Sequence, residues 1–417
     1  MRFARLALLP LFAVACTRAV ATAPTPARTA PLPAPRLVPV DALVPAPPIA
    51  VGFDPELPAR LDSIVRIGLE QGAAPGAALA VGRFGRLVHL KGYGAIDYAA
   101  GAPTVDAATI YDLASLTKVV ATTTAAMILE EEGKLDLSRT VQSYLPEFAA
   151  PDKASITVRM LLTHRGGLEA FAPLWKTWHG RADYLAQINA RPLANPPGTK
   201  IIYSDWDFVL MGMIVERITG TTLDAFTAAR VFGPLGMTSA RFTPDTTDTA
   251  LMRRIAYTAL DTLRGQLHGT VHDPNAWALG GVSGHAGLFA SARDLAVFVQ
   301  MLLNGGTYAG VRILKPTTIA RWTSAQDVGS SRALGWDTPS AVSSAGRFFS
   351  PRSFGHTGYT GTSIWVDPER GLFVVLLMNR VNSRGEATRH VQLRRDVADA
   401  VQSAIRDAPI IDWEVRR

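Results

Sequence analysis

Cysteine is almost absent from this sequence, since Cys16 is the one cysteine among 417 residues. A single cysteine excludes a disulfide framework within the chain and a cysteine-rich metal site. The eight histidines form no His-Glu-x-x-His pattern, so we expect neither a metal nor a cofactor. Runs of basic residues are missing as well. The formal net charge of +7 comes from scattered basic residues, and we expect no nucleic-acid partner.

Long apolar runs are also missing, and the most apolar one lies at the N-terminus. Residues 6–15 (LALLPLFAVA) follow two arginines and are too few to span a bilayer as a helix. Ala13-Val14-Ala15 has the small residues of a signal-peptide cleavage site, and Cys16 follows at once, which resembles a bacterial lipobox. We expect residues 1–15 to be a signal peptide and Cys16 to carry a lipid anchor, because the single cysteine occupies the one position that needs it. Ordinary secretion, with Cys16 as the first residue, is the alternative.

The segment after Cys16 predicts where the protein works. Thr17, rather than aspartate, follows the cysteine, which by the same resemblance indicates sorting to the outer membrane of a Gram-negative host. Residues 16–50 are rich in alanine, proline and threonine and predict a linker that buries no core. We therefore expect a protein on the periplasmic side of the cell envelope, anchored by lipid to the outer membrane or else secreted into the periplasm.

Residues 51–417 have the composition and the patterns of one folded domain. The chain is 48% hydrophobic and 18% charged, which is typical of a globular protein with a large core. Hydrophobic periodicity and turn signals predict a helix over 57–69, strands over 77–81, 87–90, 362–366 and 372–378, and helices over 119–132, 208–219 and 391–405. Strands at both ends of the domain indicate an α+β or α/β sandwich. In it, an antiparallel sheet from both chain ends is flanked by helices, with an inserted, mostly helical subdomain.

Ser115-Leu116-Thr117-Lys118 is the first group of candidate catalytic residues. The run that follows predicts a helix ended by Gly133, so Ser115 lies at its start and Lys118 follows one turn later on the same face. Free N–H groups at a helix start favour a developing negative charge. A serine hydroxyl becomes a nucleophile when a base removes its proton, and a lysine held one turn away can serve. An N-cap serine with a solvated lysine is the structural alternative.

Two further motifs carry polar residues next to predicted turns or strands. Tyr203-Ser204-Asp205 joins a turn to a helical stretch, where a tyrosine can reach a cleft and relay a proton. His356-Thr357-Gly358 precedes the strand at residue 362, and small residues on an edge strand let a substrate backbone approach closely. The N–H of Tyr359, with that of Ser115, could form an oxyanion hole. A buried core tyrosine and a surface histidine are the structural alternatives.

Together, in this order, the three motifs resemble those of the serine β-lactamase and penicillin-binding-protein superfamily, and most of all its class C-like branch. That branch holds D-alanyl-D-alanine carboxypeptidases, class C β-lactamases and related esterases. The resemblance implies that Ser115 is the acylated nucleophile, that Lys118 and Tyr203 handle its proton, and that the His356 strand binds substrate. Met160–Leu168 also resembles the family and is interpreted as scaffold.

Asp205 departs from the family pattern, which has asparagine at this position. An ionised aspartate accepts hydrogen bonds but donates none, so we expect it to raise the pKa of Lys118 and to bind a substrate ammonium, unless it faces away from the cleft. A glycine- and histidine-rich stretch over 269–285 resembles a subgroup linked to cell-wall peptide trimming. Its polar residues are expected either to line the cleft or to structure the loop; they are His272, Asp273, Asn275 and His285.

The predicted function is a D,D-carboxypeptidase-like serine hydrolase that acts on peptidoglycan peptides or a related small molecule. A class C-like β-lactamase or an esterase is the first alternative, since all three use the same acyl-enzyme. A lipoprotein that binds muropeptides or penicillin without turnover is the second, although intact Ser115, Lys118 and Tyr203 argue against it.

Overall fold

A computed structural model describes residues 42–382 and 388–413. The predicted signal peptide, Cys16 and most of the predicted linker lie outside the described residues. The last part of the linker belongs to the folded body, because β1 (Val44–Pro45) pairs with a strand of the main sheet. Across these two ranges no helix has the length and apolarity needed to cross a membrane.

The main sheet combines strands from both ends of the domain, as predicted. Its order is β1-β3-β2-β13-β12-β11, and only the short edge pair β1–β3 is parallel. Its other strands are β2 (Gly76–Arg83), β3 (Arg86–Gly94), β11 (Phe354–Thr357), β12 (Ser363–Asp367) and β13 (Leu372–Met378). β2 and β3 run further than predicted, so Phe84 and Gly85, both with positive φ, form a tight two-residue hairpin turn.

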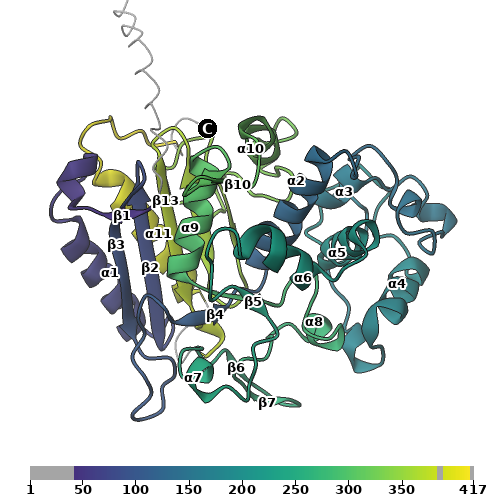
Figure 1. Ribbon diagram of the computed structural model, residues 1–417, viewed down its shortest axis with the longest axis horizontal. Helices are drawn as coiled ribbons and strands as arrows, with labels where there is room; N and C mark the ends of the chain where they lie inside the picture. The colour runs from purple at the N-terminus through teal and green to yellow at the C-terminus, as the bar shows by residue number, and fades with distance from the viewer. Residues whose placement is uncertain (1–41, 383–387, 414–417) are drawn as a thin grey trace, which may run out of the picture. The chain divides into compact units, whose positions relative to one another are not determined.

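Helices cover both faces of this sheet (Figure 1). On one face α1 (Leu57–Glu70) and α11 (Arg389–Ser403) pack on side chains such as Leu79 and Leu376. On the other face α9 (Ala292–Leu303) packs on neighbours such as Ala80 and Val375. Side chains along a strand alternate between faces, so strands buried on both sides are largely apolar, as β13 is throughout and β2 is up to its last residue, Arg83.

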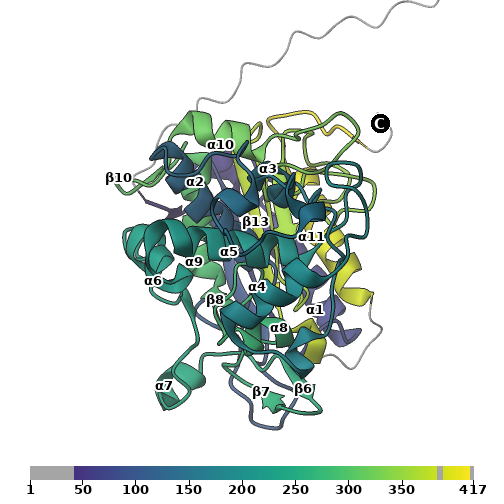
Figure 2. The ribbon, with the colours of Figure 1, turned by 90° about the vertical axis from the view of Figure 1, so that its right-hand side faces the viewer.

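The inserted part of the chain is mostly helical and lies beside the sheet, facing the viewer in Figure 2. Its helices are α2 (Thr124–Glu131), α3 (Val158–Leu162), α4 (Gly180–Ala190), α5 (Asp205–Thr219), α6 (Leu223–Thr227) and α8 (Pro274–Ala278). The predicted helix over 119–132 is present, but residues 118–123 form a π-helical turn ahead of α2. π-Turns in helices are frequent at functional sites.

A second, three-stranded sheet joins the two parts and runs β4-β8-β5. Its strands are β4 (Ile110–Asp112), β5 (Arg241–Phe242) and β8 (Leu288–Ser291). The smaller elements are α7 (Thr249–Met252), α10 (Pro316–Thr323) and the hairpins β6 (Ala259–Asp261) with β7 (Gly265–Leu267) and β9 (Thr307–Tyr308) with β10 (Val311–Arg312). Because β4 ends at Asp112, the position of Ser115 is set by the end of a strand in this small sheet.

Candidate active site

A cavity of about 690 Å³ lies where the β11 edge of the main sheet meets the helical part. Seven residues in or next to the three motifs line it: Ser115, Tyr203, Asp205, His356, Thr357, Gly358 and Tyr359. Lys118 is fully buried behind them. The structure therefore brings together three motifs that lie far apart in the sequence.

Ser115 lies on the turn between β4 and a helix whose first residue is Leu116. The residue before it, Ala114, has a φ of 46°, in the left-handed region that residues with a Cβ rarely adopt. Its N–H donates to a carboxylate oxygen of Asp112 over 2.8 Å, which holds this turn. The expected position of Ser115 at a helix start is confirmed.

The Lys118 ammonium has three acceptors within reach of its Nζ. Nζ donates to Ser115 Oγ at 3.0 Å, to Asp205 Oδ1 at 2.8 Å and to the His285 carbonyl at 3.3 Å. Burial lowers the pKa of Lys118, but attraction to Asp205 and Tyr203 outweighs it, so the net pKa is raised. Three bonds use all three ammonium protons. Lys118 is therefore a protonated donor in this geometry, and the expected effect of Asp205 on its pKa is confirmed.

Tyr203 lies against several cations and rings at the N-terminus of α5. Its ring centroid is 4.8 Å from Lys118 Nζ and 5.3 Å from the Arg332 guanidinium carbon. The ring also packs on His164, with centroids 4.5 Å apart, and on His356, at 5.9 Å. The Tyr203 ring is thus fixed beside the Ser115–Lys118 pair.

A buried histidine–aspartate pair supports Tyr203 from behind, and the sequence did not reveal it. His164 Nδ1 lies 3.2 Å from Asp207 Oδ2, and both side chains are 1% exposed. The backbone N–H of Ser204 also donates to Nδ1, so this nitrogen carries no proton. Burial lowers the pKa of His164 and raises the pKa of Asp207, so Asp207 is the protonated partner. His164 belongs to the 160–168 stretch that resembles the family, which was the one available signal.

The β11 edge supplies the other wall of the cavity. His356 is buried rather than on the surface, and burial lowers its pKa to about 3, so it is neutral. Tyr359 is 60% exposed at the rim, between His272 on one side and Arg380 at 4.0 Å. Within the described ranges, neither the N–H of Ser115 nor that of Tyr359 donates to a protein acceptor. Both amides remain available to a ligand.

The glycine- and histidine-rich stretch is divided between the two expected roles. His272, Asp273 and His285 line the cavity. Asn275 does not, since its side chain bonds Tyr184 Oη at 2.8 Å and the Ala172 carbonyl at 3.1 Å, which structures the loop.

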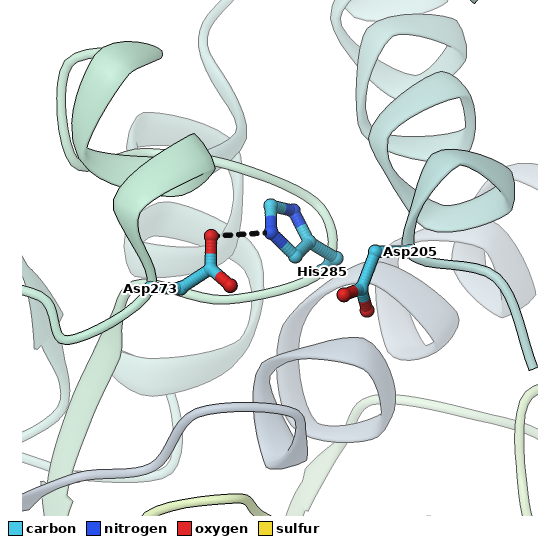
Figure 3. A group of neighbouring side chains, drawn as sticks. All are labelled: Asp205, Asp273 and His285. Atoms are coloured by element: carbon cyan, nitrogen blue, oxygen red, sulfur yellow. Dashed lines mark hydrogen bonds and ion pairs between the residues drawn. The ribbon is translucent and has the colours of Figure 1, made fainter. Parts of the chain in front are cut away.

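Asp205, Asp273 and His285 form the one group in the described chain whose ligand atoms could together hold a metal ion, all within 4.8 Å (Figure 3). In this geometry other partners engage them. Lys118 binds Asp205, and Asp273 Oδ1 accepts from His285 Nε2 at 2.9 Å and from the Ala276 N–H at 2.7 Å. In this geometry the positive charge next to Asp205 is therefore the Lys118 ammonium.

Three arginines also line the cavity, and sequence reasoning missed them. Arg394 comes from α11, and its guanidinium donates to three carbonyls of the 358–362 turn. Arg380 Nε donates to the Tyr359 carbonyl. Arg332 is different, because no hydrogen bond or salt bridge from its guanidinium is found among the described residues, although it lies over the Tyr203 ring and attracts the Asp337 carboxyl electrostatically. Its N–H donors therefore remain available to a ligand in the pocket that holds Ser115.

Comparisons with known proteins agree with this geometry. A family model described as Beta-lactamase matches residues 61–399. A Salmonella agona (strain SL483) protein named "Putative D-alanyl-D-alanine carboxypeptidase" is 33% identical over 382 residues, covering 82% of this chain and 87% of that protein.

Two solved structures share the fold. A penicillin-binding-protein homologue from Caulobacter crescentus has a TM-score of 0.67 and 23% identity, covering 84% of this chain and 99% of that one. A β-lactamase/D-alanine carboxypeptidase from Pseudomonas syringae has a TM-score of 0.67 and 20% identity, covering 82% and 98%.

Proposed function

This chain belongs to the β-lactamase family and is a serine hydrolase of that superfamily, and from this premise we propose that it is a D,D-carboxypeptidase-like enzyme of peptidoglycan peptides. The observation that carries the proposal is the hydrogen bond from Lys118 Nζ to Ser115 Oγ, at 3.0 Å, beside a cavity that Arg332 also lines. The similarity to the Salmonella protein supports the same reaction class.

Acylation starts with attack of Ser115 Oγ on the carbonyl carbon of the scissile peptide. Lys118 is protonated and cannot take the Oγ proton, so Tyr203 relays it: the phenol accepts that proton and gives its own to the leaving nitrogen. The C–N bond breaks, the terminal amino acid leaves as an amine, and a Ser115 ester remains. Water then hydrolyses the ester, and its proton restores the serine hydroxyl.

Negative charge develops on the carbonyl oxygen during the attack, and hydrogen-bond donors must stabilise it. The free N–H groups of Ser115 and Tyr359 are suited to this oxyanion, and the helix start at Leu116 adds a favourable dipole. The Lys118 ammonium lies beside Oγ and stabilises negative charge there as well. These groups act on the transition state more than on the neutral substrate.

The charged side chains that line the cavity suit a substrate with both charges. The Arg332 guanidinium, whose N–H donors are not used by described residues, suits the terminal carboxylate that a carboxypeptidase substrate carries, in competition with Asp337. Asp205, whose side chain is 20% exposed, suits a substrate amine such as that of a diamino acid. A carboxylate-recognising site favours a peptidase over an esterase, which needs no such group.

Two alternatives share part of this chemistry. A class C-like β-lactamase or an esterase would use the same acyl-enzyme and differ in the acyl donor. A non-catalytic binder of muropeptides or penicillin would lack turnover, and the complete set of Ser115, Lys118 and Tyr203 argues against it.

We propose a periplasmic location with lipid anchored at Cys16, which the N-terminal sequence motivates. The proposal predicts that Cys16→Ser moves the protein from the membrane to the soluble fraction. Unchanged membrane association in that variant contradicts the anchor and leaves the activity proposal untouched.

Incubation with purified muropeptides, followed by mass spectrometry, tests the proposed function. We expect loss of one terminal D-alanine, and no loss with Ser115→Ala. Intact-mass measurement after penicillin or fluorophosphonate treatment should show a covalent adduct that disappears in the same variant. Ester or β-lactam turnover without peptide trimming favours the first alternative, and an adduct of equal yield in Ser115→Ala excludes Ser115 as the nucleophile.

A further inference from the structure

Asp112, the last residue of β4, has a carboxylate that is 2% exposed and does not line the cavity. Oδ1 accepts the Ala114 N–H at 2.8 Å, and Oδ2 accepts the His272 N–H at 2.6 Å. Ala114 adjoins Ser115, and His272 adjoins Asp273. One carboxylate therefore joins two loops that are about 160 residues apart in the chain and that both end in the cavity.

The backbone of the same residue holds a third loop. The Asp112 carbonyl accepts from Thr360 Oγ1 at 2.6 Å, and the next carbonyl, of Leu113, accepts from Thr362 Oγ1 at 2.9 Å. These threonines belong to the turn between β11 and β12, which includes Tyr359. His272 and Tyr359 stack at 5.4 Å, so the second and third loops also touch each other.

These bonds act where the backbone is strained. The left-handed φ of Ala114 is unfavourable for a residue with a Cβ and persists only when the surroundings fix it. The bond from the Ala114 N–H to Asp112 is one fixed point, and it directly precedes the Ser115 N–H. Loss of this bond would let the nucleophile turn relax away from the geometry in which Lys118 Nζ reaches Oγ.

We propose that Asp112 is a positioning residue for the proposed hydrolase reaction: it aligns the Ser115 turn, the His272–Asp273 loop and the Tyr359 turn through its two carboxylate oxygens and its carbonyl. The proposal rests on the proposed function, because it assigns Asp112 a part in presenting Ser115 and the Tyr359 N–H. Asp112 touches neither the cavity nor a reacting atom and acts through its neighbours.

The electrostatics of Asp112 add a pH dependence. Burial raises its pKa to about 6, although the N–H groups of His272 and Ala114 lower it. Among charged neighbours, Asp273 raises the pKa and Arg264 lowers it. On the side of the third loop the titratable groups are Tyr359 and, beyond it, Arg380.

The ionised and neutral forms of Asp112 hold the loops differently. The ionised carboxylate accepts from both N–H groups. The neutral acid carries an O–H on one oxygen, so one N–H loses its full acceptor. We expect the site to loosen as the pH falls through about 6.

The test compares Asp112→Asn with Asp367→Asn. Asparagine keeps the shape of the side chain but turns an NH₂ group toward one of the two N–H donors. Asp367 is the matched control, because its buried carboxylate accepts from Ser350 and Gln402 and does not line the cavity. The readouts are the rate of Ser115 labelling by a fluorophosphonate and the pH profile of hydrolysis of a reporter ester, with folding checked by circular dichroism.

We expect Asp112→Asn to lower kcat about 10- to 100-fold with KM changed less than about threefold, because a small displacement of reacting groups has effects of this size. The acid limb near pH 6 of the wild-type profile should flatten in this variant. Asp367→Asn should lose thermal stability yet keep wild-type kcat and the acid limb. Wild-type kcat and an unchanged acid limb in Asp112→Asn overturn the proposal.

A second pair of variants keeps the idea falsifiable if Asp112→Asn fails to fold. Thr360→Val removes the hydroxyl that bonds the Asp112 carbonyl, and Thr360→Ser retains it. We expect a slower labelling rate in the first and recovery in the second, while equal rates in both contradict the inferred third link. Labelling that persists in Ser115→Ala refutes the proposed function itself, which is a different result from unchanged labelling of Ser115 in Asp112→Asn.

Discussion

The site contains two histidine–aspartate pairs of opposite electrostatic character. His164 and Asp207 are both 1% exposed, and burial makes both neutral. Asp273 is 21% exposed in the cavity, and burial is outweighed there by His285 and the Ala276 N–H, so its pKa is lowered to about 2. The same two residue types thus form a neutral pair behind Tyr203 and a charged carboxylate in the cavity.

Attraction to His285, together with an additional backbone donor, explains the difference better than the distance does. The two pairs have similar lengths, 3.2 Å and 2.9 Å. Asp273 accepts from a backbone N–H at the start of α8, where free N–H groups stabilise an anion. Asp207 has no such donor, and its Oδ1 has no partner among the described residues. An aspartate next to a histidine is therefore not ionised for that reason alone.

The largest expected effect comes from breaking the neutral pair. Asp207→Ala should lower the free energy of unfolding by about 2–3 kcal/mol, because it leaves a small cavity and removes the O–H donor to His164. Asp207→Asn should stay within about 1 kcal/mol of wild type, since its NH₂ group replaces the O–H as donor. Urea denaturation measures both changes. If asparagine is as damaging as alanine, Asp207 is ionised and the contrast between the pairs is wrong.

Local patterns explain which parts of this architecture the sequence predicted. The strands at both ends and the helices over 57–69 and 391–405 have clear periodicity, and the structure confirms them within a few residues. The π-turn over 118–123 was missed, because its residues have the same apolar pattern as an ordinary helix. The structure starts α5 at Asp205, whereas the prediction started it at residue 208. The prediction was late because aspartates in the first turn interrupt the apolar pattern.

The candidate site was predicted where motifs are contiguous and missed where pairing is tertiary. Ser115 and Lys118 share one helix turn, so their contact follows from spacing. His164 and Asp207 are 43 residues apart, and Asp112 reaches His272 over 160. No periodicity signals such pairs. Arg332 and Arg394 come from segments with no motif, so only the fold brings them to the cavity.

The second prediction concerns pH, for which the two pairs should have opposite signs. The folded-state pKa of Asp273 is about 2, below the unfolded value of 3.8, so its stabilisation is present above pH 3.8 and is lost as the pH falls toward 2. This contribution is about 2 kcal/mol. The folded-state pKa of Asp207 is raised, so its stabilisation is complete below pH 3.8 and is lost as the pH rises through that raised pKa.

Asparagine variants separate these two contributions. Asp273→Asn should flatten the loss of stability between pH 4 and 2, whereas Asp207→Asn should leave that loss intact and improve relative stability at high pH. Thermal unfolding across this pH range gives both curves. The same pH dependence in both variants would show that the two carboxyls do not differ in the folded state.

The smallest effect concerns what orients each imidazole. Ser283 Oγ lies 2.8 Å from His285 Nδ1, whereas His164 Nδ1 lies 3.2 Å from the backbone nitrogen of Ser204 and 3.2 Å from Asp207 Oδ2. A side-chain partner can be removed by substitution and a backbone partner cannot. Ser283→Ala should therefore lower stability by about 1 kcal/mol and shift the imidazole ¹⁵N signals of His285. Ser204→Ala is the matched control.

Ser204→Ala removes a hydroxyl that donates to the Glu169 carbonyl, so it should also lower stability by about 1 kcal/mol. The His164 signals should nevertheless stay in place, because the Ser204 N–H remains. Two serines of equal energetic weight would then differ in their effect on the neighbouring histidine, which separates orientation from stability. The contradicting outcome is a shift of the His164 signals in Ser204→Ala that is as large as the shift of the His285 signals in Ser283→Ala. That result would show that the backbone N–H does not fix the His164 tautomer. Asp207 would then lose its assignment as the proton donor.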